Sequence, residues 1–236
     1  MVKYILTTSE LVKKYSGFFA VDGVTLSIPE NKVYGLLGPN GAGKSTILKM
    51  LSGIARPTSG KITYEGRVWS RNDLGTISAL IETPPLYGNL TAEDNLLVRA
   101  KALGIPKERI CEVLETVELT NTGSKKAKRF SLGMKQRLGI ALALLNKPKL
   151  MILDEPANGL DPIGIASLRQ LIRSFPEQGI TTIVSSHILS EIEHTVDYIG
   201  IISNGKLGYE GELPGGGSLE TLFKEVVTHT PGRRGE

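Results

Sequence analysis

Short apolar runs alternate with helical patterns along much of the chain. Three of these runs are nearly unbroken, at residues 33–37, 150–153 and 181–185. Such runs are typical of parallel strands that are covered on both faces. Each is followed by apolar residues at helical spacing, at residues 45–52, 164–175 and 188–195. Strands and helices in this order predict right-handed crossovers and an α/β fold built on a mixed, mostly parallel sheet.

The N-terminal part has a different pattern. Residues 4–6 and 11–15 have the composition of short strands, and residues 24–28 alternate apolar with polar side chains until Pro29 stops the run. Residues 61–64 add a further candidate strand. We interpret these segments as an N-terminal antiparallel β subdomain.

A helical insertion interrupts the alternation in the middle of the chain. Three helical segments follow one another with no strand between them, at residues 92–103, 107–117 and 132–145. They predict an inserted helical subdomain over about residues 83–147. Nearer the C-terminus, Pro214 and the three glycines after it predict a break. We therefore expect a principal domain over residues 1–215 and a short extension over residues 216–236.

The composition is that of a globular protein. The 236 residues are 40% hydrophobic and 22% charged, which excludes extensive disorder and fibrous architectures. The net charge of +4 is only a weak indication of nucleic acid or a membrane surface. No apolar run approaches the ~18 residues of a spanning helix. We therefore expect that this chain does not cross a membrane. The single cysteine, Cys111, cannot form an intramolecular disulfide, so we expect a reducing compartment.

The strongest motif is a complete phosphate loop. Residues 38–45, GPNGAGKS, match G-x-x-x-x-G-K-[ST] between a predicted strand and a predicted helix. The glycines let backbone N–H groups surround phosphate, while Lys44 reaches the β and γ phosphates and Ser45 offers its hydroxyl to Mg²⁺. The candidate ATP-binding residues of this segment are Gly38, Pro39, Asn40, Gly41, Ala42, Gly43, Lys44, Ser45 and Thr46.

Two adjacent carboxylates end the buried run at residues 150–153. Ligands of open α/β sheets bind at the carboxyl ends of strands, where Asp154 and Glu155 lie. We assign Asp154 to Mg²⁺ and Glu155 to the attacking water, which it orients or deprotonates. Neighbouring residues on a strand point in opposite directions, so two adjacent acids can have separate roles.

A second motif identifies a family. Residues 130–137, FSLGMKQR, begin a helical pattern with Ser131 at the expected N-cap. The segment resembles the signature of ATP-binding cassette (ABC) ATPases, commonly Leu-Ser-Gly-Gly followed by Gln. The order of phosphate loop, signature, Asp-Glu strand, residues 158–161 and a histidine after a strand is also similar to that family. The resemblance covers about residues 11–212 and implies a P-loop NTPase core.

The resemblance implies further site residues. Tyr15 resembles the aromatic residue that stacks on adenine, although an ordinary half-exposed strand tyrosine remains an alternative. Val21 resembles the aliphatic contact beside that aromatic residue. Asp161 resembles the D-loop carboxylate that communicates between subunits. His187 resembles the switch histidine at the γ-phosphate. The signature residues, expected to contact the partner's nucleotide, are Ser131, Leu132, Gly133 and Met134.

The resemblance also implies an assembly. ABC ATPases work as head-to-tail dimers in which each ATP lies between one phosphate loop and the partner's signature. We therefore expect a second ATPase subunit, in a homodimer, together with integral-membrane transporter subunits. ATP and Mg²⁺ are the implied cofactors, and the cytoplasmic face of the cell membrane is the implied location, with peripheral attachment. The membrane subunits are expected to dock near residues 83–89.

Other classes of cassette fit less well. Cassettes that act on DNA insert long coiled coils, and the 87 positions from Lys44 to Ser131 leave no room for one. Cassettes that act on ribosomes carry two copies in one chain. A binding or sensory module without turnover would not need Glu155 and His187. We therefore expect a transporter ATPase with no nucleic-acid partner, and keep a soluble cassette as the less favoured alternative.

Two departures from the common pattern point to a narrower group. Leu132 stands where the signature usually has its first glycine, and its side chain is expected to crowd the approach of the opposite nucleotide. Glu82 stands where most cassettes have the Q-loop glutamine, and it can reach Mg²⁺ or the attacking water. Both segments resemble the cassettes of lantibiotic self-protection exporters and their bacitracin-resistance relatives. Export of another drug or a lipid is the alternative.

A basic cluster precedes and enters the signature segment. Its members are Lys125, Lys126, Lys128, Arg129, Lys135 and Arg137. Two interpretations remain open at this point. The cluster is either a surface that faces triphosphate or the anionic cytoplasmic leaflet, or an ordinary solvated loop and helix face.

Overall fold

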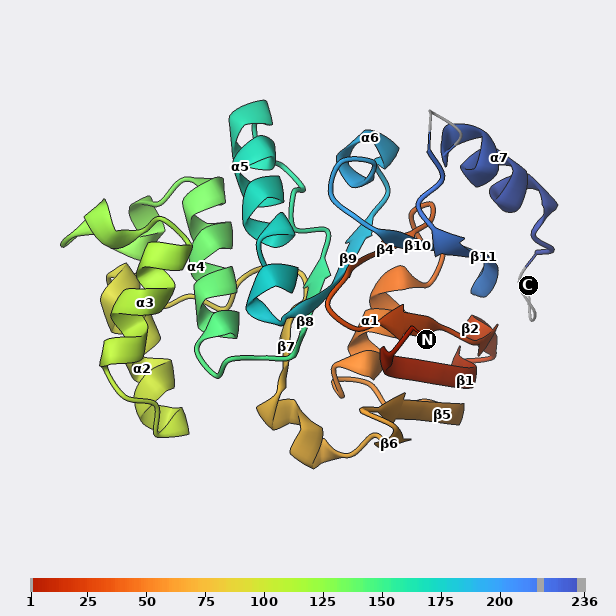
Figure 1. Ribbon diagram of the computed structural model, residues 1–236, viewed down its shortest axis with the longest axis horizontal. Helices are drawn as coiled ribbons and strands as arrows, with labels where there is room; N and C mark the ends of the chain where they lie inside the picture. Colours follow the sequence, from red (N-terminus) through yellow and green to blue (C-terminus); the bar gives the residue numbers. More distant parts are fainter. Residues whose placement is uncertain (1, 216–218, 233–236) are drawn as a thin grey trace.

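A computed structural model describes residues 2–215 and 219–232. In these residues two sheets and several helices form a mixed α/β structure (Figure 1). One sheet is antiparallel and lies near the N-terminus, and the other is mostly parallel and passes through the centre of the molecule. The predicted α/β fold class is confirmed.

The antiparallel sheet has the strand order β2-β1-β5-β6, with β3 paired to β1. Its strands are β1 (Tyr4–Tyr15), β2 (Phe18–Val24), β3 (Ser27–Pro29), β5 (Ser59–Tyr64) and β6 (Arg67–Val68). The two short strands predicted at residues 4–6 and 11–15 are thus one long strand. Register shifts divide its length, so its first part pairs with β3 and its second part with β2.

The strand predicted at residues 24–28 is also different in the structure. Val24 ends β2, and β3 begins only at Ser27. The hydroxyl of Thr8 explains the break, because it donates to the Val24 carbonyl at 2.9 Å and accepts from the Leu26 amide at 2.8 Å. A side chain from β1 therefore replaces part of the backbone ladder at this point.

The central sheet has the order β11-β10-β4-β9-β8-β7 and is parallel except for its β10–β11 pair. Its strands are β4 (Val33–Leu37), β7 (Ile77–Leu80), β8 (Leu150–Asp154), β9 (Thr181–Ser186), β10 (Tyr198–Ser203) and β11 (Lys206–Glu212). The first turn after β4 leads into α1 (Lys44–Leu51), and η1 (Arg71–Gly75) precedes β7.

Successive side chains on the central strands supply two separate cores. Val33 and Leu37 of β4 pack among the helices on one face, whereas Tyr34 and Leu36 pack against α1 and the antiparallel sheet on the other. Strand residues alternate between faces, and here both faces are covered. This explains why the strands read as unbroken apolar runs in the sequence.

The helical subdomain contains α2 (Ala92–Leu103), α3 (Glu108–Thr116) and α4 (Leu132–Leu144), where the periodicity predicts them. Short 3₁₀ turns lie between α3 and α4, at η2 (Thr120–Thr122) and η3 (Ala127–Arg129). Helix α2 begins with a capping box of Thr91 and Asp94 and ends at the left-handed Gly104. These local signals explain why its predicted and observed bounds agree.

The remaining helices pack on the same face of the central sheet as Val33 and Leu37. They are α5 (Pro162–Arg173), η4 (Pro176–Gln178), α6 (Leu189–Ile192) and α7 (Leu219–His229). Helix α7 packs against β10 and β11, with Leu219 fully buried. The predicted break at residues 214–217 lies partly outside the described residues, as does the end of the predicted extension. No described helix has both the length and the apolar character needed to span a membrane.

Candidate active site

The phosphate loop connects the end of β4 to the start of α1. Gly38 and Gly43 have φ values of +155° and +113°, and a Cβ atom on either would lie 2.2 Å or 2.5 Å from a backbone carbonyl oxygen. Neither position can therefore hold a side chain without movement of the backbone. The two glycines wrap the loop around the N-terminal end of α1, where free N–H groups favour an anion.

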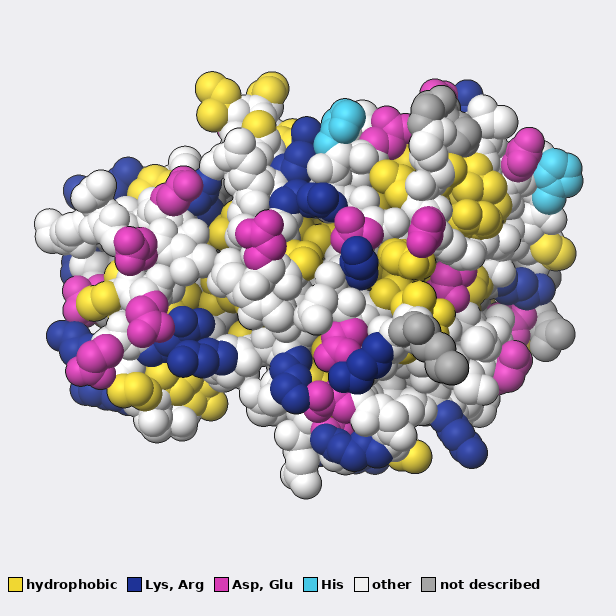
Figure 2. Space-filling model, in the orientation of Figure 1, with side chains coloured by type: hydrophobic (Ala, Val, Ile, Leu, Met, Phe, Trp, Pro, Cys, Tyr) yellow, Lys and Arg dark blue, Asp and Glu magenta, His cyan; other side chains and the backbone are white. Residues whose placement is uncertain are grey.

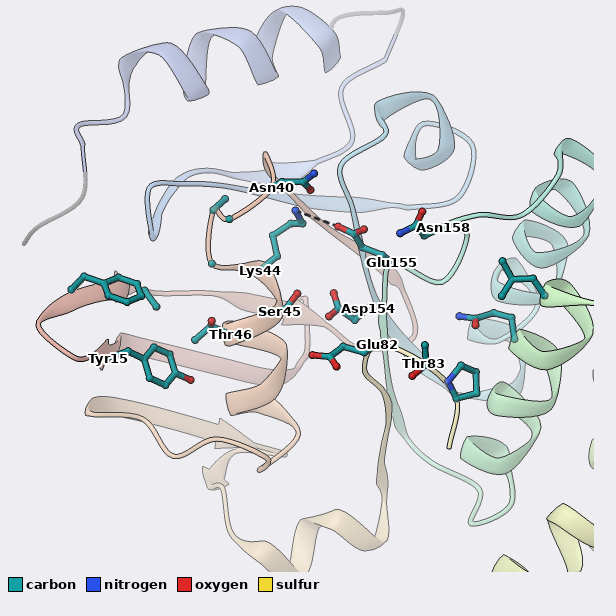
Figure 3. A pocket seen from close by; sticks show the side chains of 18 residues that line it. Tyr15, Asn40, Lys44, Ser45, Thr46, Glu82, Thr83, Asp154, Glu155 and Asn158 are labelled. Atoms are coloured by element: carbon teal, nitrogen blue, oxygen red, sulfur yellow. Dashed lines mark ion pairs between the residues drawn. The ribbon is translucent and has the colours of Figure 1, made fainter. Parts of the chain in front are cut away.

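A cavity of about 600 Å³ opens between this loop and the helical subdomain (Figure 3). Most of the candidate residues predicted for ATP and Mg²⁺ lie on its walls. It is lined by residues 40–46 and by Tyr15, Phe18, Ala20, Glu82, Thr83, Pro84, Leu132, Gln136, Asp154, Glu155 and Asn158. Segments from five parts of the sequence thus meet around one space of ligand size.

Lys44 is held inside the loop by its own chain. Its ammonium group donates to the carbonyl oxygens of Gly38 and Pro39, at 2.8 Å and 3.2 Å, and lies 3.7 Å from Glu155 Oε1. Burial lowers the pKa of Lys44, and the nearby carboxylates of Glu155 and Asp154 partly oppose this shift. The lysine is therefore prearranged beside the loop, with its charge balanced by Glu155.

Asp154 and Glu155 are positioned together by Ser185. The Ser185 hydroxyl donates to Asp154 Oδ1 at 2.6 Å and accepts from the Glu155 amide at 2.9 Å. Asp154 and Ser185 are neighbours in the parallel register of β8 and β9. Glu155 itself has φ +47°, an uncommon left-handed conformation for a residue other than glycine. The backbone turns at this point, so the two adjacent carboxylates face different parts of the site.

His187 lies next to Glu155. Its Nδ1 atom is 3.2 Å from Glu155 Oε1, and the two side chains remain partly exposed. Glu155 therefore lies between the ammonium group of Lys44 and the imidazole ring of His187. The geometry groups a potential base with two side chains that can stabilise negative charge.

Ser45, Asp154 and Glu82 lie around the start of α1 (Figure 3). Glu82 follows β7 and has φ +63°, and its carboxylate accepts from Lys49 Nζ at 2.8 Å. This hydrogen bond is the largest cause of the lowered pKa of Glu82 and of the raised pKa of Lys49. Glu82 thus lines the cavity and is paired with a lysine, and its role as a metal ligand stays a prediction.

Aromatic and small side chains close the other end of the cavity. Tyr15 is 40% exposed, and its ring centroid is 6.3 Å from that of Phe18 and 4.9 Å from Lys13 Nζ. Val21, predicted to contact the base, is fully buried in the core and does not line the cavity. Ala20 lines it instead, because adjacent residues of β2 point to opposite faces. The structure thus places Ala20, and not Val21, on the wall of the cavity, and the contact of Val21 with the base stays a prediction.

The signature residues begin α4. Ser131 caps the helix by accepting from the Met134 amide at 3.2 Å, and it is exposed. Leu132 lines the cavity and is 49% exposed, whereas Gly133 and Met134 are not among the lining residues. A Cβ atom on Gly159 would lie 2.9 Å from Leu132 Cδ2, so the leucine rests on a glycine that provides its space.

Asp161 lies outside the cavity and has a local role. Its carboxylate accepts from the Gly164 amide at 2.9 Å and caps the N-terminus of α5. This position, just before Pro162, is typical of a helix start. The structure therefore explains an aspartate here by helix capping, while its predicted role between subunits stays a prediction.

The basic cluster does not act as a unit. Arg137 has a side chain only 15% exposed, which bonds to the Val117 carbonyl, the Ser167 hydroxyl and Glu118. Lys126 lies 4.0 Å from Asp94, and Lys128 and Arg129 are exposed. Arg137 thus joins α4 to the end of α3 and to α5. The other members fit the interpretation of a solvated surface.

Sequence reasoning missed Ser185 and Lys49 as site residues. The signal for Ser185 lies in the pairing of two strands, which places it beside Asp154. The signal for Lys49 is its helical spacing of four from Ser45, which places both on one face of α1. Phe18 and Ala20 were also missed, since two-residue periodicity along β2 requires the strand bounds first.

Comparisons with known proteins identify relatives of this chain. The ABC transporter family model matches residues 21–158. The chain is 52% identical over 223 residues to the lantibiotic transport ATP-binding protein SrtF of Streptococcus pyogenes, covering 94% of this chain and 97% of the relative. It is 51% identical over 208 residues to the bacitracin transport ATP-binding protein BcrA of Bacillus licheniformis, covering 86% and 68%.

A solved structure has the same fold. The dimeric post-hydrolysis state of the ATP-binding cassette MJ0796, bound to ADP and Pi, superimposes with a TM-score of 0.78 at 25% identity. The alignment covers 89% of this chain and all of the other. The chain therefore belongs to the ABC transporter family, as an ATP-binding subunit whose hydrolysis of ATP is coupled to transport.

Proposed function

We propose that this chain powers the export of a peptide antibiotic, of the lantibiotic self-protection type, through separate membrane subunits. The observation that carries the proposal is the 52% identity to a lantibiotic transport ATP-binding protein over nearly the full length of both chains. The 51% identity to a bacitracin transport ATP-binding protein supports the same class of cargo. Glu82 and Leu132, the two departures from the common cassette pattern, are further support from the residues themselves.

ATP is proposed to occupy the 600 Å³ cavity with its phosphates at the N-terminal end of α1. Tyr15 and Ala20 would contact the base at the other end. Backbone N–H groups of residues 40–46 and the ammonium group of Lys44 would bind the β and γ phosphates. Lys44 then exchanges its carbonyl and Glu155 contacts for phosphate oxygens, which offer it more negative charge.

Mg²⁺ fits the donor set beside the phosphates. Ser45 supplies a hydroxyl, and Asp154 and Glu82 supply carboxylate oxygens, which are the hard ligands that this ion prefers. The described residues contain no group of three His, Cys, Asp or Glu side chains that would hold a metal ion by themselves. Phosphate oxygens and water would therefore complete the shell, and the bound ion would neutralise charge on the β and γ phosphates.

Glu155 is proposed as the general base for the attacking water. Its carboxylate lies beside Lys44 and His187, which supports a position at the γ-phosphate end of the cavity. Ser185 holds the backbone amide of Glu155 and the carboxylate of Asp154 at the same time. Ser185 therefore links the backbone at the proposed base to the carboxylate of the proposed metal ligand, and His187 would contact the γ-phosphate.

A second copy of the chain is proposed to complete each site. The side chains of Leu132, Ile163 and Ile188 are 49%, 80% and 38% exposed, at the signature, at the start of α5 and in the loop that follows β9. Figure 2 shows hydrophobic side chains protruding where α5 begins. A head-to-tail homodimer would cover them and bring Ser131 and the α4 N-terminus to the partner's γ-phosphate. The relative MJ0796, solved as a dimer, supports this arrangement.

The membrane subunits are proposed to dock where the helical subdomain meets the central sheet. A second cavity of about 320 Å³ lies there, between β7, α2 and α4. Tyr87 and Val98 line it and are 55% and 42% exposed, so they offer apolar contacts to a partner. The loop from Glu82 to Tyr87 connects this surface to the ATP cavity. Docking here would place the chain peripherally on the cytoplasmic face of the cell membrane.

A growth-inhibition panel tests the cargo. Cells that lack this gene and carry either the wild-type gene or Lys44→Ala on a plasmid are exposed to lantibiotics, bacitracin and chemically unrelated drugs. We expect only the wild-type gene to restore tolerance, and only to one class of peptide antibiotic. Equal tolerance of both strains to all peptide antibiotics, with both proteins expressed, would contradict this cargo and favour export of another drug or a lipid.

Affinity purification separates transport from the less favoured soluble function. The tagged chain is recovered from detergent-solubilised membranes, and its bound material is examined for integral-membrane protein and for RNA. Stoichiometric membrane protein is the expected result. RNA without membrane protein would instead support a soluble cassette.

A further inference from the structure

Two lysines of α1 each hold one carboxylate of the ATP cavity. Lys44 lies at the start of the helix and is 3.7 Å from Glu155. Lys49, five residues later, donates to Glu82 at 2.8 Å. Lys44 belongs to the phosphate loop, and its contact with Glu155 follows from that position. Lys49 lies outside the phosphate loop, so that motif does not explain its pairing with Glu82.

The charges around the cavity show why Glu82 needs a counter-ion. Glu82, Asp154 and Glu155 place three carboxylates on its walls, and the triphosphate would bring further negative charge. A glutamine at position 82 would add none of this repulsion. The Glu82 carboxylate adds repulsion toward the other carboxylates and the phosphates. At short range solvent screens this repulsion only partly, because one side of the Lys49–Glu82 pair faces protein. Lys49 supplies one positive charge at this point.

Lys49 also determines where the Glu82 carboxylate lies. Glu82 has left-handed backbone geometry, and Pro84 and Pro85 follow closely, which restricts the loop. The side chain is 68% exposed, so packing does not hold it in place. The hydrogen bond to Lys49 is the contact that orients it along α1, on the face that carries Ser45.

We propose that Lys49 is a positioning residue for Glu82, which holds the carboxylate against α1 and releases it to the metal site when Mg²⁺ and nucleotide bind. This rests on the proposed ATP and Mg²⁺ site. Lys49 and Mg²⁺ compete for the same carboxylate, so the lysine sets how much Mg²⁺ is needed. The positive charge of Lys49 also offsets the negative charge of Glu82 when nucleotide binds without metal.

The competition gives opposite effects for the two single variants. In Lys49→Met the Glu82 carboxylate has lost its counter-ion but is free to bind Mg²⁺. Nucleotide binding without metal weakens, and the Mg²⁺ concentration for half-maximal binding falls. In Glu82→Gln the lysine is left unpaired, so binding without metal strengthens and more Mg²⁺ is needed. Each shift is expected to be about threefold, as for a partly exposed ion pair.

The experiment measures binding of a fluorescent ATP analogue to the purified full chain, first in EDTA and then during a Mg²⁺ titration. The variants are Lys49→Met, Glu82→Gln, the double variant and Lys49→Arg. Lys101→Met removes an exposed lysine from α2 and serves as the control for net charge. Melting temperatures verify folding, so a merely structural effect of Lys49 is recognised without any activity assay.

The double variant gives the decisive comparison. Because it removes both charges, its binding without metal is expected to return close to wild type. In the Glu82→Gln background, Lys49→Met should have little effect on the Mg²⁺ titration. Lys49→Arg should behave like wild type. Equal shifts of the Mg²⁺ titration from Lys49→Met in the wild-type and Glu82→Gln backgrounds, or no shift of that titration in either background, would overturn the proposal.

Failure of the underlying site has a different result. If wild type does not bind the analogue, the proposed ATP site itself is wrong. If wild type binds but Glu82→Gln leaves the Mg²⁺ titration unchanged, Glu82 is not a metal ligand and the competition with Lys49 is overturned with it.

Discussion

The two halves of the proposed ATP site differ in how completely one chain forms them. Around the phosphate loop, each charged side chain has a partner from the same chain: Lys44 has the loop carbonyls and Glu155, Asp154 has Ser185, and Glu82 has Lys49. At the signature, Ser131 is exposed, and its hydroxyl accepts from the Met134 amide of the same helix. Leu132 rests on Gly159 and is half exposed.

This difference indicates which half of the proposed ATP site depends on the assembly of two chains. The phosphate-loop half is organised by internal hydrogen bonds and ion pairs, so it exists in the isolated chain. The signature half offers an exposed helix N-terminus and apolar side chains to whatever covers them. A single chain should therefore bind nucleotide, whereas hydrolysis should need the dimer.

Substitution of the proposed base gives the largest expected effect. Glu155→Gln keeps the size of the side chain but removes its charge and its basicity, so ATP hydrolysis is expected to fall by about 10²–10⁴-fold. Nucleotide binding is retained, and ATP should accumulate a closed dimer. Steady-state hydrolysis, nucleotide binding and size-exclusion chromatography with ATP measure these three properties.

Lys44→Ala is the matched control for this prediction. It removes charge-assisted hydrogen bonds to phosphate, so ATP binding itself should weaken, by about 10- to 100-fold. Equal hydrolysis rates of wild type and Glu155→Gln would remove Glu155 from the role of base. A closed dimer of Glu155→Gln without ATP would contradict the division of the site into two halves.

Loosening the signature helix should give the next largest effect. Arg137→Met removes the bonds of α4 to the Val117 carbonyl and to Ser167, and leaves a buried carbonyl unpaired. We expect the free energy of unfolding to fall by about 1–3 kcal/mol. Arg129→Met, which removes an exposed arginine from the same cluster, is expected to change little. Urea denaturation of both variants measures the difference, and equal midpoints would contradict this role of Arg137.

The contact between Leu132 and Gly159 gives the smallest expected effect. Gly159 and Gly179 both have φ +76°, but only a Cβ at Gly159 would contact Leu132, since nothing lies within 4 Å of one at Gly179. Both Gly→Ala variants should lose about 1–2 kcal/mol of stability from backbone strain. Gly159→Ala should also displace Leu132 and lower ATP turnover about threefold, which is a barrier change of about 0.7 kcal/mol.

A second substitution tests the origin of that loss. In Leu132→Ala the displaced side chain is absent, so adding Gly159→Ala should change turnover no more than Gly179→Ala does. Thermal unfolding and steady-state hydrolysis of these variants provide the comparison. A threefold loss that persists in the Leu132→Ala background would show that the leucine is not responsible.

Local patterns predicted the parts of the fold that depend on short stretches of chain. The apolar runs predicted the strands β4, β8 and β9, because both of their faces are covered. The expected cap at Ser131 predicted the start of α4, and the helical spacing predicted the bounds of α2. The long strand β1 was divided in the prediction, since its bulges and its change of partner depend on strands far along the chain.

The candidate site was predictable in the same uneven way. The phosphate loop and the Asp154–Glu155 pair follow from contiguous motifs in which backbone geometry and chemistry coincide. Val21 was assigned to the cavity, but the alternation of β2 turns Ala20 to it. Arg137 resembled part of a basic surface, yet it connects its own helix to two segments that are distant in the sequence.

The sequence by itself determined the chemistry of this protein: a nest of backbone amides with a lysine, two adjacent carboxylates after a buried strand, and a helix that begins at Ser131. Each depends on residues close together in the chain, where spacing settles geometry. Only the tertiary structure decided that Ser185 holds Asp154, that Lys49 holds Glu82 and that Gly159 makes room for Leu132. Those pairs form across sheets and loops, and long-range packing, which local spacing does not encode, sets their distances.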